Sequence, residues 1–493
     1  MRSFRGKAAT LICALLLCSL TVVCCGGCGL IFITRTGADE SAPVSDPSPI
    51  LTDSPIPVTT AKTPDIVDFS SRIDEAQEAL NALYDVDVSS YDLMFCAAAE
   101  ADNTISPGED SPIYASCNLR NKMVFEKYAC GFFNFTLPLE QLTADLSASV
   151  RSGADTDYFA DILLLPEPSA VSLRNAGLLM DLRRLPFYSV STTGNAGAGN
   201  YISSNYFDIS AAGEDPASFY ALFFNRTLAG NELTDSLNAA AREKNLTWET
   251  FFTAVRSYPS DASLDNVCIS IGDSDAPEYL ADIVCIRSGV DFMTDSSGSV
   301  PGIGWNDENS AAMTLTLTDI AAAFFNKSTS SAEDFNAGKT LFRFAPLSDI
   351  FKLYDKKVEW GLLPLPASVG GAPAVTVSSS RNVFCVPANN TRTELTGLLL
   401  TAFDVASKDW IRDQFAVICV EKYMRDNASC LNLKLILDDE VYRDFSYIFY
   451  PSVPKLADAT FGAAGNCLMT GTPIADAVKA VRATVEKNLK RVY

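Results

Sequence analysis

Short, uninterrupted apolar runs alternate with amphipathic segments along most of this 493-residue chain. The runs "YDLMFCAAA", "FFNFTL" and "DILLLP" are typical of buried strands, and "NLRNKMVFEKYA" and "LEQLTADLSASVRSG" between them are typical of helices. Continuous apolar strands separated by amphipathic helices indicate βαβ units, in which helices cover both faces of a parallel sheet. The alternation therefore predicts an α/β fold.

The same alternation continues in the second half of the chain. Here "LTWETFFTAVRSY" and "AAMTLTLTDIAAAFFN" are predicted helices, and "TLFRFAP", "WGLLPLP" and "VFCVPA" are predicted strands that end near a proline. The pattern is mostly helical from Leu395 to Val405 and again from Asp409 to the end. Because the chain is longer than one core usually organises, two domains are expected.

The first helix of the folded part is expected in "SSRIDEAQEALNALY", shortly after residue 66. Ser71 and Asp74 have the spacing of a capping pair at the start of a helix. Apolar residues recur at helical intervals, so one face should be buried. That face contains Ile73, Ala76, Leu80 and Leu83.

The N-terminal segment has no charged residue from Ala8 to Thr34, after the basic residues Arg2, Arg5 and Lys7. A membrane-spanning helix needs about 20 apolar residues, and positive charge before it places that end in the cytoplasm. The segment is an uncleaved anchor, a lipoprotein signal or a cleaved signal peptide. Each of the three exports the rest of the chain, so we expect it at the extracellular face of the cell membrane.

The residues around Cys28 favour the lipoprotein interpretation only in part. Cys28 follows Gly26 and Gly27, as in a lipid-attachment motif, but Cys25 stands where an aliphatic residue is usual. The run "GLIFIT" also stays apolar past Cys28. Residues 36–65 then contain six prolines and no aromatic residue, which predicts an extended, disordered tether.

The composition excludes several classes of function. The chain has 60 acidic and 38 basic residues, a net charge of −22, so its surface repels phosphate backbones and nucleic-acid binding is not expected. It has no histidine, which removes Ser-His-Asp and Cys-His catalysis and most catalytic zinc sites. The segment "GNAGAG" lacks the lysine of a phosphate-binding loop and the spacing of a dinucleotide site. We therefore predict neither a cofactor nor a metal.

The cysteines also point away from a disulfide-stabilised protein. Of the 14 cysteines, five lie in the first 35 residues and nine follow. An odd, scattered set does not resemble a disulfide framework, so most of the nine are predicted to be free thiols. Cys96 and Cys385 lie in apolar strand-like runs and should be buried.

Several segments, taken in order, resemble the bacterial extracellular solute-binding proteins that deliver ligands to ABC transporters. These segments are "PIYASCNLRNKMVFEKYACGFF", "LSASVRSGADTDYFADILLLPEPSAVSLRNAGLLMDLRRLPF", "FYALFFNRTL", "LTWETFFTAVRSY", "FNAGKTLFRFAPLSDIFKLYDKKVEWGLLPLP" and "EKYMRDNASCLNLKLILDDEVYRDFSYIF". They cover most of residues 105–490, and their collinear order carries the resemblance. More narrowly, the chain looks like a clostridial subgroup that is often grouped with sugar binders.

The resemblance implies a two-lobed, periplasmic-binding-protein-like fold of type II, with a ligand cleft between lobes that close about a hinge. By analogy the chain crosses between lobes near residues 208–222, returns near 366–384, and crosses once more before the C-terminal helices. The implied divisions are an anchor at 1–35, a tether at 36–65, lobe 1 at 66–218, lobe 2 at 219–371, a return to lobe 1 at 372–410, and a helical region at 411–493 that completes lobe 2.

Four polar residues are candidates for ligand contact. Glu100 follows the first strand and Glu167 follows "DILLLP", where open α/β sheets bind small molecules. Both have carboxylates that can accept hydrogen bonds from hydroxyls or cations, and both also fit solvated surface acids. Asn225 and Arg343 lie in strand-like segments of the second lobe and fit either ligand contact or a structural role.

The aromatic residues depart from the family pattern. The subgroup often has paired tryptophans after "LRRLPF", where this chain reads "YSVSTTGNAGAGNYISSNYF", and sugar binders tend to have a tryptophan near the position of Ser348. Rings at such positions stack on sugar faces. Tyr206 and its neighbours Tyr201 and Phe207 are possible replacements or hinge-packing residues, and Trp305 lies in a loop that can reach the ligand. The other tryptophans, Trp248, Trp360 and Trp410, are expected in the core.

Three functions remain open at this point. The first is a membrane-tethered receptor that passes a solute, with sugars favoured, to ABC transporter permease subunits. The second is a solute-binding fold that has lost its transported ligand and acts as a sensor or interaction module, as the missing tryptophans suggest. The third, a secreted glycosidase that uses two carboxylates, matches no motif in the chain. The expected protein is not an enzyme.

Overall fold

The computed structural model describes residues 67–153, 159–188, 213–257, 267–271, 332–367, 375–378 and 382–442, with 287, 293–294, 302–303, 479, 483 and 487. These residues belong to one compact unit, Thr63–Tyr493. Among them, no helix combines the length and the apolar character that a membrane crossing requires. The predicted anchor, the tether and the helix predicted in "AAMTLTLTDIAAAFFN" lie outside the described residues.

The first sheet contains four strands: β1 (Asp92–Ala98), β2 (Gly131–Leu137), β3 (Ile162–Pro166) and β11 (Asn382–Cys385). Their order is β11-β3-β1-β2. Strand β1 runs parallel to β2 and β3, which confirms the βαβ prediction for this part. Strand β11 returns from far along the chain and pairs antiparallel with β3, so the sheet is mixed rather than purely parallel.

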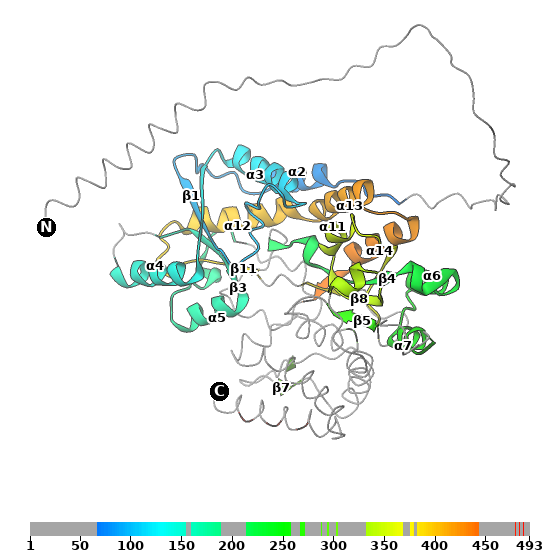
Figure 1. The fold of residues 1–493 in the computed structure, drawn as a ribbon. Helices are drawn as coiled ribbons and strands as arrows, with labels where there is room; N and C mark the ends of the chain where they lie inside the picture. Colours follow the sequence, from blue (N-terminus) through cyan, green and yellow to red (C-terminus); the bar gives the residue numbers. More distant parts are fainter. Residues whose placement is uncertain are drawn as a thin grey trace, which may run out of the picture. The chain divides into compact units, whose positions relative to one another are not determined.

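Helices cover both faces of this sheet (Figure 1). Helices α3 (Tyr114–Tyr128), α12 (Thr393–Ser407) and α2 (Ile73–Asn81) contact one another on one side. On the other side are α4 (Leu139–Ser152) and α5 (Glu167–Asn175), of which α5 contacts β3 and β11. Strands β1 and β3, which lie between these layers, are almost wholly buried, as their continuous apolar sequences predict.

Helix α2 has the predicted buried face but not the predicted cap. Ala76 and Leu80 are buried, and the other two residues of that face, Ile73 and Leu83, pack against the core. The helix begins with Arg72 as its N-cap, and no side chain caps it. The expected Ser71–Asp74 pair is therefore wrong, because the chain starts the helix one residue later than that pair requires.

The second sheet contains β4 (Tyr220–Asn225), β5 (Val267–Ile271), β8 (Thr340–Pro346) and β9 (Trp360–Leu363), in the order β5-β8-β4-β9. Strand β4 is antiparallel to β8 and β9, whereas β5 is parallel to β8. The prediction of a parallel sheet is wrong here. An apolar run is buried equally well beside a parallel or an antiparallel neighbour, so the pattern does not report strand direction.

Helix α14 (Asn427–Asp438) protects the outer edge of β9. The backbone N–H of Leu362 donates to Ser429 Oγ at 3.0 Å, and its carbonyl accepts from Asn432 Nδ2 at 2.7 Å. An edge strand exposes unpaired backbone groups that invite association, and these two side chains occupy them. The remaining elements are α6 (Arg226–Arg242), α7 (Trp248–Ser257), α10 (Ala332–Asn336), α11 (Asp349–Leu353), α13 (Trp410–Lys422), η1 (Leu182–Arg184), and the strand pair β6 (Met293–Thr294) and β7 (Gly302–Ile303).

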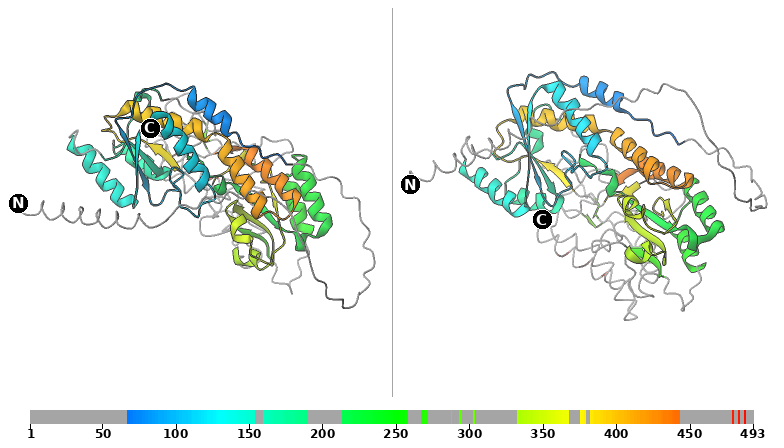
Figure 2. Two further views of the ribbon diagram at one scale, coloured as in Figure 1. Left: turned by 90° about the horizontal axis from the view of Figure 1, so that it is seen from above. Right: turned by 45° about the horizontal axis from the view of Figure 1, so that its top comes forward.

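Three short segments far apart in sequence lie side by side next to the second sheet. The first is η4 (Pro216–Ser218), which leads directly into β4; the second is β10 (Val375–Val377); the third is β12 (Glu440–Tyr442). Strands β10 and β12 pair in parallel, Phe219 bridges to Ser378, and the hydroxyls of Ser218 and Ser378 lie 2.7 Å apart. We call these three the crossing segments, after the crossings between lobes that the resemblance implies and that stay a prediction. Figure 2 gives two further views of the fold.

Strand β12 is a short exception to the expectation that the chain is mostly helical from Asp409 onward. Helices α13 and α14 confirm the first part of that prediction, and then the chain turns into a strand. Its three residues have no periodicity of their own and are strand only because β10 pairs with them. The predicted lobe boundaries stay a prediction, although the strands of the second sheet all come from residues 219–371.

The core predictions for tryptophan and cysteine agree with the structure. Trp248, Trp360 and Trp410 are buried. The cysteines whose side chains the structure describes are all buried and outside disulfides, namely Cys96, Cys117, Cys130, Cys385, Cys419 and Cys430. Burial raises the pKa of Cys96 to about 12 and that of Cys130 to about 11, because a thiolate is poorly solvated there.

Candidate functional site

The strands of the first sheet bring three polar residues to one edge. Strands β1 and β3 are parallel and in register, so the residues that follow them, Glu100 and Glu167, leave the sheet at the same end. Strand β11 begins there too, with Asn382 opposite Pro166. The carboxyl ends of the strands in open α/β sheets are where small molecules bind, so this edge is the candidate ligand site.

Glu100 is exposed at this edge and is tied to a helix. Its carboxylate accepts from the backbone N–H of Leu139 at 3.0 and 3.2 Å, which satisfies a free donor at the start of α4. Both oxygens share this N–H, and the exposed carboxylate keeps further acceptor capacity. Glu167, the first residue of α5, is almost wholly buried.

Two acidic residues at this edge were not anticipated from the sequence. Asp102 lies in the exposed loop after β1, and its backbone carbonyl accepts from Asn382 Nδ2 at 3.3 Å. Asp215 lies at the first crossing segment, where Oδ1 accepts from Ala217 N–H at 2.9 Å. Burial raises the pKa of Asp215 to about 6, the bond from Ala217 opposes that rise, and the charge of Asp102 adds to it.

The charge of Asp102, in the loop after β1, therefore affects the protonation of Asp215 at the first crossing segment. A carboxylate whose charge is disfavoured in the free protein gains from a ligand that donates hydrogen bonds to it, as sugar hydroxyls do. The signal for Asp215 in the sequence is "EDPAS", an Asp-Pro start of a short helical turn. In a chain with 60 acidic residues, that signal alone does not distinguish it from its neighbours.

A buried arginine positions the loop that contains Asp102. Arg120 is fully buried on α3 and donates to the carbonyls of Thr104 at 2.8 Å and Ile105 at 3.3 Å. Its guanidinium also donates to Ser407 Oγ at 3.3 Å and lies 5.6 Å from the ring centre of Phe403. The loop after β1 is therefore fixed to α3 and to the end of α12.

Asn225 and Arg343, both predicted as candidates, are buried around the second sheet and have partners within the chain. Asn225 caps α6 by accepting from Thr227 and Leu228 N–H, and its amide donates to Gly338 O at 3.1 Å. Arg343 pairs with Asp349, and its Nε donates to Asp349 Oδ2 at 2.7 Å. These contacts support structural roles, and ligand contact by either residue stays a prediction.

The predicted aromatic contacts cannot be placed at this edge. Tyr206 and Trp305, with Tyr201 and Phe207, lie outside the described residues. Among the described residues there is no group of three or more acidic or cysteine side chains arranged to hold a metal ion. What the described edge offers is a set of acceptors, in Glu100, Asp102 and Asp215, beside the crossing segments.

Comparison with known proteins identifies the fold. No protein-family model matches the chain, and no curated protein matches its sequence. Among solved structures, the cyclic alpha-maltosyl-1,6-maltose binding protein of Arthrobacter globiformis matches with a TM-score of 0.55 at 14% identity, over 81% of this chain and 99% of that one. The chain has the fold of the two-lobed solute-binding proteins.

Two further solved structures share this fold. The galacto-N-biose-/lacto-N-biose I-binding protein of an ABC transporter from Bifidobacterium longum matches with a TM-score of 0.52 at 14% identity, over 83% of this chain and 98% of that one. The sugar-binding protein MalE of Xanthomonas citri matches with a TM-score of 0.52 at 11% identity, over 81% of this chain and 98% of that one. All three are binding proteins rather than enzymes, and the predicted type II solute-binding fold is confirmed.

Proposed function

We propose that the chain is the extracellular receptor of an ABC importer and holds a small solute, a carbohydrate first, between two lobes. One observation carries the proposal. The crossing segments lie beside the second sheet, and the charge of Asp102, in the loop after β1 of the first sheet, acts on Asp215 at the start of the first crossing segment. A solute held there touches both the sheet edge and the hinge, which is the arrangement that couples binding to closure.

The acceptors favour a ligand with many hydroxyl donors. Glu100, Asp102 and Asp215 offer carboxylate oxygens, and hydrogen bonds to charged acceptors contribute about 1.5–3 kcal/mol each. The three structural neighbours are named for the sugars that they bind, which supports the same class. We propose Tyr206 and Trp305 as the rings that cover the sugar faces. Membership of the clostridial sugar-binder-like subgroup belongs to this proposal and rests on the collinear segments.

We also propose that residues 1–35 hold the protein at the outer face of the cell membrane, where permease subunits would receive the solute. The uncharged stretch after three basic residues supports this placement. Intact mass of the detergent-extracted protein distinguishes the anchors. The full mass indicates an uncleaved helix, and cleavage before Cys28 with an added diacylglyceryl group indicates a lipoprotein. A soluble product that begins near residue 36 contradicts both.

Binding is tested with a panel of oligosaccharides, peptides and polyamines, by thermal shift and then by calorimetry. A bound solute raises the melting temperature by mass action. Asp102→Asn should weaken binding by roughly tenfold, the loss expected for one charged hydrogen bond. Asp110→Asn, an exposed acid of the same loop, is the matched control and should leave affinity unchanged.

The outcomes separate the alternatives. Binding without turnover, weakened in Asp102→Asn and unchanged in Asp110→Asn, supports the receptor. A folded protein that answers no solute of the panel favours the sensor or interaction module. Release of shorter sugars from an oligosaccharide identifies a hydrolase, and the receptor proposal is then wrong.

A further inference from the structure

Strand β2 forms one edge of the first sheet. It stands last in the strand order β11-β3-β1-β2, and among the described residues no strand pairs with its outer side. Phe133, Asn134 and Thr136 in this strand are exposed to solvent. The ring of Phe133 is 60% exposed, although phenylalanine is among the residues most often buried. The edge therefore presents an apolar ring to solvent beside its free backbone groups.

The strand has none of the usual features that prevent an exposed edge from associating. Such features include a charge, a proline or a bulge within the strand. The sequence GFFNFTL contains no charged residue and no proline, and its register with β1 is unbroken over all seven residues. The edge of β9 is different, because Ser429 and Asn432 of α14 occupy its backbone groups. The chain thus protects one sheet edge and leaves the edge at β2 open.

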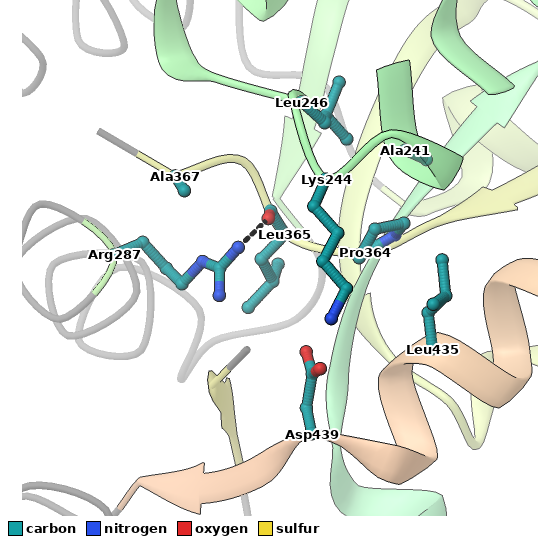
Figure 3. Close-up of a pocket in the computed structure, with 9 residues that line it drawn as sticks. All are labelled: Ala241, Lys244, Leu246, Arg287, Pro364, Leu365, Ala367, Leu435 and Asp439. Atoms are coloured by element: carbon teal, nitrogen blue, oxygen red, sulfur yellow. Dashed lines mark hydrogen bonds between the residues drawn. The ribbon is translucent and has the colours of Figure 1, made fainter. Parts of the chain in front are cut away.

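A ligand pocket does not account for the exposed ring of β2. The pocket in Figure 3 is formed by α6, the segment after β9 and α14, so it belongs to the second sheet. What lies at β2 is a strand edge, and a strand edge is completed by another strand.

The pairing with β1 decides which backbone groups of β2 face outward. Gly131 N–H donates to Tyr91 O at 3.1 Å, and Leu137 O accepts from Ala99 N–H at 2.8 Å, so Gly131 and Leu137 bond on the β1 side. The N–H and C=O of one strand residue point to the same side, and the side alternates along the strand. The residues whose backbone groups face outward are Phe132, Asn134 and Thr136.

We propose that β2 pairs antiparallel with β2 of a second copy of this chain, so that one sheet continues across a symmetric dimer. A two-fold axis at Asn134 places this residue opposite its own copy and places Phe132 opposite Thr136 of the second copy. All outward N–H and C=O groups of the strand then have partners. Asn134 is the middle residue of the strand, so this register also gives the longest overlap.

The same register covers the exposed ring. Phe133 lies opposite Phe135 of the second copy, in the non-hydrogen-bonded position where opposing side chains come closest. Phe135 is held in place within its own copy, because its ring packs edge-on against that of Phe159 with ring centres 6.0 Å apart. The occupant is a second copy because β2 supplies each exposed group with its own complement. This proposal does not depend on the receptor proposal.

The dimer should be weak and should tighten with salt. A single strand pair buries less than the roughly 1,600 Å² of a standard interface, so we expect a dissociation constant of about 10–100 µM. Each copy has a net charge of −22, so two copies repel one another at low ionic strength. Salt screens this repulsion, so the dimer should be at least roughly threefold tighter in about 0.5 M salt than in about 0.05 M.

Sedimentation equilibrium of the full chain in density-matched detergent tests the proposal. Phe133→Lys removes the ring and places a charge at the edge, so it should weaken association at least roughly tenfold. Asn134→Pro removes one outward N–H, keeps the pairing with β1, and should weaken association similarly. Tyr354→Lys changes an exposed ring outside the first sheet and is the matched control, with an expected change of less than about twofold. Circular dichroism and thermal unfolding show that each variant is folded.

Cross-linking tests the register. In the proposed dimer the two Asn134 Cα atoms lie about 5.5 Å apart, which is within disulfide range. Asn134→Cys should therefore give a cross-linked dimer under mild oxidation, above the level of the parent, whereas Gln141→Cys on the exposed side of α4 should not. The proposal is overturned if the parent is monomeric at about 100 µM in about 0.5 M salt. It is also overturned if Phe133→Lys and Asn134→Pro associate as the parent does, or if Asn134→Cys cross-links no more than the parent.

Discussion

Replacing Asp215 by asparagine tests whether a carboxylate is kept at the first crossing segment at the expense of stability. Burial raises the pKa of Asp215 from 3.8 to about 6. A raised pKa means that the folded protein holds this proton more tightly than the unfolded chain does. Stability is therefore lost as the pH rises from the unfolded value through about 6. For a difference of about two pKa units, at about 1.4 kcal/mol each, the loss at neutral pH approaches about 3 kcal/mol.

Asp215→Asn removes the charge and keeps an oxygen that can accept from Ala217 N–H. We expect the free energy of unfolding of the variant to exceed that of the parent by up to about 3 kcal/mol at about pH 8. At about pH 5 the gain should be roughly half as large. Urea unfolding followed by circular dichroism at several pH values measures the difference, with Asp110→Asn as the exposed control. A variant that is no more stable than the parent at any pH would refute the reasoning. If the variant is more stable and binds solute less tightly, the carboxylate is retained for function.

Other predictions concern the buried charges and thiols. Asp349→Ala should lower the free energy of unfolding by about 3–5 kcal/mol in urea, because Arg343 is left buried and unpaired. The double variant Arg343→Met with Asp349→Leu should lower it less, and equal losses of stability would contradict this account. Arg412→Ala should lower the free energy of unfolding by about 1–3 kcal/mol, because buried Glu214 loses a partner at 2.7 Å, and Glu214→Gln should lower it less in the same assay. If Glu214→Gln is the more destabilising change, Arg412 does not stabilise the protein through this ion pair. Alkylation followed by mass spectrometry should modify the buried thiols only after denaturation, and rapid labelling in the native state would count against their burial; the thiols are Cys96, Cys117, Cys130, Cys385, Cys419 and Cys430.

The sequence predicted the elements of this fold better than their pairing. The runs that form β1 and β3 are apolar throughout because helices cover both faces of the sheet, and a continuous apolar run can be recognised in the sequence alone. The direction of β4 beside β8 is not visible, since both orientations bury the same side chains. Strand β12 is too short to show a hydrophobic periodicity, so only its pairing with β10 identifies it as a strand.

The candidate site was predicted less completely. The sequence places Glu100 and Glu167 at one sheet edge because they follow apolar runs that end there, and ligand contact by either residue stays a prediction. Asp215 was missed because its distinguishing property, a raised pKa, comes from burial and from Asp102 across the fold.

The central claim is that a solute binds between two lobes and closes them. Small-angle scattering of the compact unit Thr63–Tyr493, with and without a solute identified by calorimetry, tests it most directly. Closure brings the lobes together, so the radius of gyration should fall on saturation, and Asp102→Asn should need a roughly tenfold higher solute concentration for the same fall. A solute that binds tightly to the parent and leaves its radius of gyration unchanged would contradict the account.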